Sequence, residues 1–229
     1  RPSPPVRPPR RPPPPPAPAR YDGAAALLLK KETGAPTFVE GFFTCPYRNF
    51  AERGLLLRER EEQTVRRADT GNFLHEVLRR LACEIASLSD IGACAAFVRA
   101  CAEDLLAHPP YSYLADTAAG GFAANSLVRE AVIVGANVFE QIRGSSYAVE
   151  SAEASFGYPN ARYGGIPLGG GLTLAGKIDR VDGAGEYVRV IDYKSGAVDT
   201  GEEAYYTGRK VQLETYLSAA AQGRTAAGA

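Results

Sequence analysis

The sequence of 229 residues contains no methionine, no pair of cysteines at the CxxC spacing and no GxxxxGK[ST] phosphate loop. Because that loop is absent, we expect no ATP site in this chain. No uncharged apolar stretch reaches the roughly 18–20 residues of a membrane helix, and the N-terminus lacks the apolar run of a signal peptide. We therefore expect a protein of the reducing cytoplasm that does not associate with membranes.

The sequence also lacks a net charge, because 26 Lys and Arg residues balance 26 Asp and Glu residues. Any affinity for nucleic acid must therefore come from local clusters of charge. One such cluster contains Arg58, Arg60, Arg66 and Arg67, which could contact phosphates or simply face solvent. Since no Met opens the chain and it stops soon after a predicted helix, we expect a C-terminally truncated fragment.

The composition divides the chain into a tail and one globular unit. Residues 1–20 hold eleven prolines and five arginines, a composition that favours an extended, disordered segment, either a linker or a ligand for an SH3-type domain. We expect residues 1–37 to be this tail and its lead-in, and residues 38–229 to be the domain.

Apolar periodicity predicts helices first and strands afterwards. Pro46 suits the first turn of a helix, and Asp69 or Thr70 suits the N-cap of the helix that carries Leu74 and Val77. Further helices are predicted at 91–107, 124–143 and 205–221, and the strand-like segments EASFGY, LTLAGKIDRVD and YVRVIDYKSG lie between the last two. This order predicts an α+β fold with a mixed central sheet flanked by helices and a helical N-terminal portion.

The segment LAGKIDRVDGAGEYVRVIDYKSG reads as a β-hairpin. A Gly–X pair such as Gly185–Glu186 suits a two-residue type II′ turn. A turn centred there places Asp179 directly opposite Asp192, with Cβ atoms about 4.5–5.5 Å apart. Alternation along the strand puts Lys194 on the same face, whereas Tyr193 points the other way.

Two clustered carboxylates form a hard-oxygen site that suits Mg²⁺ or Mn²⁺. Such a metal can lower the pKa of a bound water and stabilise charge on phosphoryl oxygens, which is the chemistry of phosphodiester hydrolysis. Lys194 would then orient the water or the phosphate. The alternative is a solvent-exposed hairpin with an ordinary Lys–Asp pair.

Three other polar residues have less specific patterns. His75 lies at the edge of an apolar helical stripe and could be a packed residue or a ligand. Gln212 and Tyr216, four residues apart, share one helical face, which could line a site or face solvent. The run Gly169–Gly171 indicates a turn between strands.

Together, GNFLHEVL, EASFG, GKIDRVD, VIDYKSG and QLETYL occur in the order and spacing that resembles RecB-like nuclease domains of the PD-(D/E)XK type, which have a restriction-endonuclease-like core. Within these, the chain is most similar to the B-subunit branch (AddB) of bacterial helicase–nucleases, whose segment ahead of the nuclease core resembles CPYRNFAERGLLLRERE. The resemblance covers about residues 38–217. It implies metal ligation by His75, Asp179 and Asp192, a catalytic Lys194, and site positions for Glu153, Gln212 and Tyr216.

The resemblance also implies a 4Fe-4S cluster, of which Cys45 matches the first ligand. The other three ligands would follow Ala229. Cys83, Cys94 and Cys101 lie in predicted helices with unlike spacings, and we expect them to be small core residues.

The function implied is that of a metal-dependent DNA exonuclease domain in double-strand break processing and recombinational repair. Its heterodimer partner would be the A subunit of the helicase/nuclease. Two alternatives stay open. One is a free-standing RecB-like exonuclease of the CRISPR-associated kind, and the other is a non-catalytic DNA-binding or scaffolding module. Divalent-metal dependence separates the enzymes from the scaffold.

Overall fold

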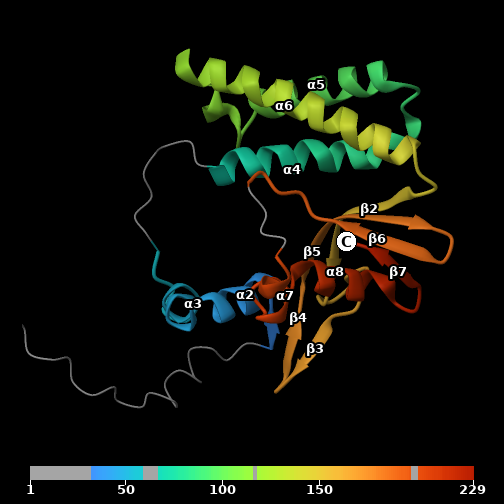
Figure 1. The fold of residues 1–229 in the computed structure, drawn as a ribbon. Coiled ribbons are helices and arrows are strands. Elements are labelled where there is room, and N and C mark those ends of the chain that lie inside the picture. Colours follow the sequence, from blue (N-terminus) through green and yellow to red (C-terminus); the bar gives the residue numbers. More distant parts are fainter. Residues whose placement is uncertain (1–31, 59–66, 116–117, 197–200) are drawn as a thin grey trace, which may run out of the picture.

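A computed structural model describes residues 32–58, 67–115, 118–196 and 201–229 (Figure 1). The predicted tail, apart from residues 32–37, lies outside these ranges, as do Arg60 and Arg66 of the basic cluster. The described part has two layers of helix with a β-sheet between them (Figure 1). This arrangement confirms the predicted α+β fold with a mixed sheet flanked by helices.

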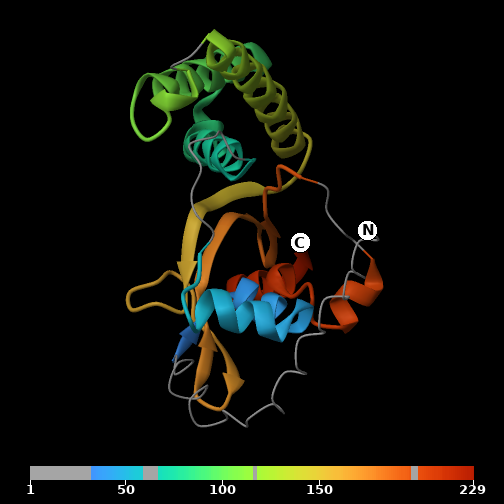
Figure 2. The ribbon, with the colours of Figure 1, turned by 90° about the vertical axis from the view of Figure 1, so that its left-hand side faces the viewer.

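The helical layer contains α4 (Arg67–Glu84), α5 (Ile91–Ala107) and α6 (Ala118–Arg143), which lie side by side in both ribbon views (Figures 1 and 2). The predicted bounds of α5 are confirmed, and Asp90 caps this helix by accepting a hydrogen bond from Ala93 N at 2.8 Å. The predicted N-cap of α4 was wrong, because the helix already begins at Arg67 and Asp69 lies in its first turn. An acidic residue there still complements the helix dipole.

Apolar side chains from these three helices form one of two core clusters. Its fully buried members include Phe73, Leu74, Val77, Leu78, Leu81, Cys94, Val98, Leu105, Leu127, Val128, Ala131, Val138 and Phe139. The stripe predicted for α4 is therefore confirmed as a core face.

The part Gly121–Arg143 of α6 is long and apolar enough, by length and composition, to cross a membrane. Its residues Leu127, Val128 and Phe139 are buried in the helical cluster, and the charged pair Arg129 and Glu130 interrupts it. We interpret α6 as the core helix of this layer, since amphipathic core helices pass the same test of length and composition.

The main sheet has the order β2-β5-β6-β7. Its strands are β2 (Ala148–Phe156), β5 (Gly176–Ala184), β6 (Tyr187–Ile191) and β7 (Thr225–Gly228). The first three are antiparallel neighbours, whereas β6 and β7 run parallel. The sheet is therefore mixed, although the sequence patterns did not predict β7.

A second sheet of three short strands was not predicted as such. It contains β1 (Thr33–Gly34), β4 (Leu172–Leu174) and β3 (Ile166–Gly169) in the order β1-β4-β3. The turn predicted at Gly169–Gly171 is confirmed between β3 and β4, and all three glycines have positive φ, which other residues adopt only with strain.

The remaining helices lie on the other side of the main sheet (Figure 1). These are α2 (Pro36–Thr44), α3 (Pro46–Arg53), α7 (Glu202–Tyr206) and α8 (Gln212–Ala221). Pro46 occupies the first turn of α3 as predicted. The single helix predicted at 205–221 was wrong, because Gly208 takes φ +71° and separates α7 from α8.

The second core cluster lies between the main sheet and α8. It contains Ala154, Phe156, Tyr163, Leu174, Ile178, Val181, Val188, Val190, Tyr216, Ala219 and Ala220. The main sheet therefore packs against α4 on one face and against α8 on the other. This packing brings side chains of both helices close to the strands.

Gly135 on α6 provides a test of the packing between α5 and α6. A Cβ atom added there would lie 2.8 Å from Val98 Cγ2, and this branched side chain has little freedom to move. We expect Gly135→Ala to lower the free energy of unfolding by about 1–3 kcal/mol, as overpacking does.

The matched control is Gly121→Ala on the same helix, where an added Cβ meets nothing within 4 Å. This variant should raise the free energy of unfolding by up to about 1 kcal/mol through helix propensity alone. Chemical denaturation of both variants measures the two effects. Equal stability changes would contradict the close approach of the two helices.

Candidate active site at the end of the β5–β6 hairpin

The β5–β6 hairpin has the geometry that its sequence predicts. Arg180 pairs with Ile191 and Ala184 with Tyr187, which leaves a two-residue loop of Gly185 and Glu186. Gly185 has φ +60°, as the first central position of a type II′ turn requires. The same register, continued by one residue, places Asp192 opposite Asp179.

On the other side of β5, strand β2 contributes a third carboxylate. Ala152 pairs with Arg180 and Ala154 with Ile178, so Glu153 falls opposite Asp179. Glu153 has φ +51°, a left-handed conformation that costs a non-glycine residue about 1–3 kcal/mol and that tends to occur at functional sites. Glu153 and Asp179 therefore face each other on β2 and β5, and Asp192, one residue beyond β6, continues the row. The backbone is strained at Glu153.

Helix α4 brings His75 to this row. The distance from His75 Nδ1 to Asp179 Oδ2 is 3.4 Å. Potential ligand atoms of His75, Glu153 and Asp179 all lie within 4.8 Å of one another. One imidazole nitrogen and two carboxylates at this spacing fit a divalent cation.

Asp192 has a different immediate partner. Its Oδ2 lies 2.6 Å from Lys194 Nζ, and its side chain is 5% exposed. Burial raises the pKa of Asp192, although the nearby Lys194 works in the opposite direction. The hydrogen bond to Asp179 likewise raises the pKa of His75. The carboxylate of Asp179 therefore favours positive charge at His75, a charge that a bound cation can also supply.

Helix α8 completes the wall of the site. Lys194 Nζ donates to Gln212 Oε1 at 3.1 Å, and Gln212 Nε2 donates to the Tyr216 hydroxyl at 2.7 Å. The shared helical face predicted for Gln212 and Tyr216 is thereby confirmed. Burial raises the pKa of Tyr216 to about 12, so this hydroxyl keeps its proton at neutral pH.

Sequence reasoning missed Glu40 on α2. Its Oε1 accepts hydrogen bonds from Val211 N at 2.8 Å and from Gln212 N at 3.1 Å, at the first turn of α8, where a carboxylate satisfies unpaired N–H groups and complements the helix dipole. No local pattern marks Glu40, because its partners lie 171 and 172 residues away.

A cavity of about 270 Å³ opens beside this part of the site. It is lined by Glu40, Asp192, Lys194, Tyr205, Lys210, Gln212 and Leu213. The predicted site residues from β6 and α8 therefore face one common space. That space lies next to the row of carboxylates and could hold a polar group of a substrate.

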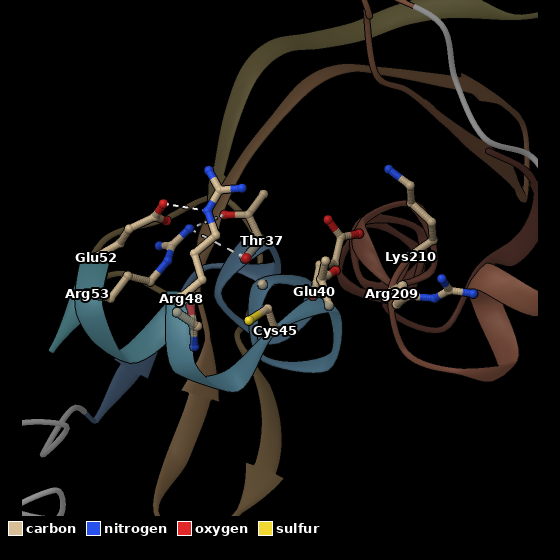
Figure 3. A pocket seen from close by; sticks show the side chains of 11 residues that line it. Thr37, Glu40, Cys45, Arg48, Glu52, Arg53, Arg209 and Lys210 are labelled. Atoms are coloured by element: carbon tan, nitrogen blue, oxygen red, sulfur yellow. Dashed lines mark hydrogen bonds and ion pairs between the residues drawn. The ribbon is translucent and has the colours of Figure 1, made fainter. Parts of the chain in front are cut away.

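Cys45 lies at the junction of α2 and α3. It lines a neighbouring cavity of about 260 Å³ together with Arg48 and Arg53, and Glu40 and Lys210 line both cavities (Figure 3). No other cysteine lines this cavity. The described residues therefore offer a cluster only one thiolate here, whereas an iron–sulfur cluster needs four.

The other cysteines belong to the helical layer. Cys94 and Cys101 are buried there, as predicted, and burial raises the pKa of both thiols. The same prediction for Cys83 was wrong, because this residue is exposed on α4. It follows the buried Ala82 and lies on the solvent side of the helix.

Comparison with known proteins identifies the family of this chain. Residues 34–229 match the model of the PD-(D/E)XK nuclease superfamily. Among curated proteins, the B subunit of the ATP-dependent helicase/deoxyribonuclease of Acetivibrio thermocellus is 30% identical over 211 residues, which are 85% of this chain and 18% of that protein. The B subunit of the same enzyme in Desulforamulus reducens is 31% identical over 196 residues, 80% of this chain and 17% of that protein.

A third relative, the corresponding B subunit of Desulfitobacterium hafniense (strain DCB-2), is 32% identical over 198 residues, 81% of this chain and 16% of that protein. The chain thus spans less than a fifth of the length of these relatives. The superfamily model, in contrast, covers nearly all of the described chain and includes every candidate residue of the site. The chain belongs to the PD-(D/E)XK nuclease superfamily.

Proposed function

We propose that residues 38–229 form a nuclease domain that hydrolyses DNA phosphodiester bonds with a divalent metal. The observation that carries this proposal is the row of Glu153, Asp179 and Asp192, with His75 at one side and Lys194 at the other. Ligand atoms of His75, Glu153 and Asp179 lie within 4.8 Å of one another, and carboxylates gathered in this way favour a cation between them.

His75, Asp179 and Asp192 would hold Mg²⁺ or Mn²⁺, and Glu153 is placed to act as a further ligand or as a base beside it. The donor set fits, since carboxylates suit Mg²⁺ and an added imidazole is compatible with Mn²⁺. When bound, the metal supplies a more acidic water and charge stabilisation at the phosphoryl oxygens.

Lys194 would contact the scissile phosphate or orient the attacking water. Its ammonium group already reaches two acceptors, Asp192 and Gln212, which fix its position. Gln212 and Tyr216 in turn hold each other. Pre-positioned donors of this kind stabilise developing negative charge without reorganising during the reaction.

The names of the relatives suggest the larger setting. We infer that the domain acts as an exonuclease on DNA strands delivered by a helicase, in the cytoplasm during break repair and recombination. There it would belong to a B subunit that pairs with the A subunit of the helicase/nuclease. In that setting Cys45 would supply one ligand of a 4Fe-4S cluster whose other ligands follow residue 229.

The first test of the proposed function replaces the lysine. Lys194→Ala should lower the cleavage rate of end-labelled linear DNA by about 100-fold or more, the usual effect of losing one preorganised donor. Binding to the same DNA should change little, since one phosphate contact contributes modestly among many. The measurements are product release with Mg²⁺ or Mn²⁺ and fluorescence anisotropy with Ca²⁺.

Arg99→Ala is the matched control, because it removes an exposed cation from α5 in the helical layer. It should cleave and bind like the unmodified chain. Chelation by EDTA should abolish cleavage in both proteins. Metal-independent cleavage, or a Lys194→Ala variant as active as the control, would contradict the proposal.

The second test compares two effects of Glu153, its backbone strain on stability and its side chain on the cleavage rate. Glu153→Gly should raise the free energy of unfolding by about 1 kcal/mol, because glycine accepts a positive φ without strain. The lost ion pair with Lys177 at 3.0 Å is partly exposed and contributes less than that amount. Cleavage should nevertheless fall.

Ala152→Gly is the control for this variant, since Ala152 lies in the same strand with negative φ. Glycine there should lower stability by about 0.5–1 kcal/mol through backbone entropy. Thermal melting and the DNA cleavage rate are measured for both. A destabilised Glu153→Gly variant that cleaves normally would remove Glu153 from the site.

A further inference from the structure

Arg180 is a charged side chain in the centre of the sheet. It is 1% exposed and lies one residue after Asp179, on the opposite face of β5. A buried guanidinium is tolerated only with close partners. Asp182 is one, since its Oδ1 lies 2.9 Å from Arg180 Nε and its Oδ2 accepts from Nη2 at 3.2 Å.

Asp182 is also shared with Arg189, whose Nε donates to Oδ2 at 3.0 Å. Asp182 therefore has a guanidinium group on each of two sides, although its Oδ1 makes no hydrogen bond. The third donor of Arg180 takes a different direction. Its Nη1 donates to the hydroxyl of Tyr193 at 2.8 Å, and its guanidinium carbon lies 5.7 Å from the centre of the Tyr193 ring.

Tyr193 stands between Asp192 and Lys194 in the sequence. Strand β6 ends at Ile191, so the sheet ladder does not hold this segment in place. Instead, Tyr193 N donates to Asp179 Oδ2 at 2.8 Å, and its ring packs edge-on against His75 with centres 5.9 Å apart. One residue therefore contacts two of the proposed metal ligands and adjoins a third.

We propose that Arg180 and Tyr193 are positioning residues, and that their hydrogen bond fixes the segment 192–194 relative to Asp179. This inference rests on the proposed function. If the buried ion pair served stability alone, apolar residues of similar volume would serve as well. The hydrogen bond from Arg180 to Tyr193 gives the ion pair a second role. The Tyr193 hydroxyl, on one face of the sheet, holds the backbone segment that presents Asp192 and Lys194 on the other face.

Tyr193→Phe removes only the hydroxyl and keeps both the ring and the backbone N–H group. In metal-free protein, amide exchange of the peptide that covers 191–195 should accelerate about fivefold, the factor expected for one lost hydrogen bond. The dissociation constant for Mn²⁺, measured by electron paramagnetic resonance without DNA, should rise by a similar factor. The cleavage kcat should fall, while KM for DNA stays unchanged.

Tyr111→Phe is the matched control. The Tyr111 hydroxyl also makes one hydrogen bond, which it donates to Asn72 O at 3.2 Å, and its ring packs edge-on against Phe73 with ring centres 5.6 Å apart. This variant should lower the melting temperature less than Tyr193→Phe does, because it leaves no buried charged donor unpaired. Exchange at 191–195 and Mn²⁺ affinity should match the unmodified chain.

Arg180→Lys keeps a charge beside Asp182 but replaces the planar guanidinium fork, which spans Asp182 and Tyr193, with a compact ammonium group. It should raise the dissociation constant for Mn²⁺ as Tyr193→Phe does. The double variant Arg180→Lys/Tyr193→Phe should have a dissociation constant no higher than that of the weaker-binding single variant. If Tyr193→Phe matches Tyr111→Phe in both exchange and Mn²⁺ affinity, the positioning role is overturned. Failure of the unmodified chain to bind Mn²⁺ or to cleave DNA would instead overturn the proposed function.

Discussion

The clustering of carboxylates between His75 and Lys194 is the constraint on which this site depends. Glu153 and Asp179 lie opposite each other on the adjacent strands β2 and β5, and Asp192 follows β6 by one residue. Clustered carboxylates need positive charge nearby to offset their repulsion. The surrounding groups supply it: His75 lies beside Asp179, Lys194 beside Asp192 and Lys177 beside Glu153.

The sequence was most informative where local rules determine geometry. A two-residue Gly185–Glu186 loop fixes the hairpin register, so the placement of Asp179 opposite Asp192 followed from counting alone. The spacing of Gln212 and Tyr216 likewise determines a shared helical face. The fold class followed from the order of periodic segments, and the bounds of α5 from its Ala-, Val- and Leu-rich composition and its lack of proline.

Long-range contacts and unusual backbone conformations could not be predicted from the sequence in the same way. The hydrogen bond of Glu40 with α8 and the pairing of β7 with β6 each join segments far apart in sequence. No local sequence pattern in these segments indicates which segment it contacts. The left-handed Glu153 breaks the alternation that strand prediction assumes. The break between α7 and α8 arises at Gly208, where an added Cβ would lie 2.8 Å from Phe43 of α2.

The contact of Glu40 with α8 also sets an order of events during synthesis. Glu40 leaves the ribosome early, whereas its partner Val211 follows 171 residues later, roughly 10–35 s at the usual rates of elongation. Until then the first turn of α8 does not exist, and Lys194 has no Gln212 to hold it. The strands with their acidic row are thus made before the wall that completes them. The contact between α2 and α8 can therefore form only after most of the domain has been synthesised, and Lys194 gains its Gln212 partner at the same stage.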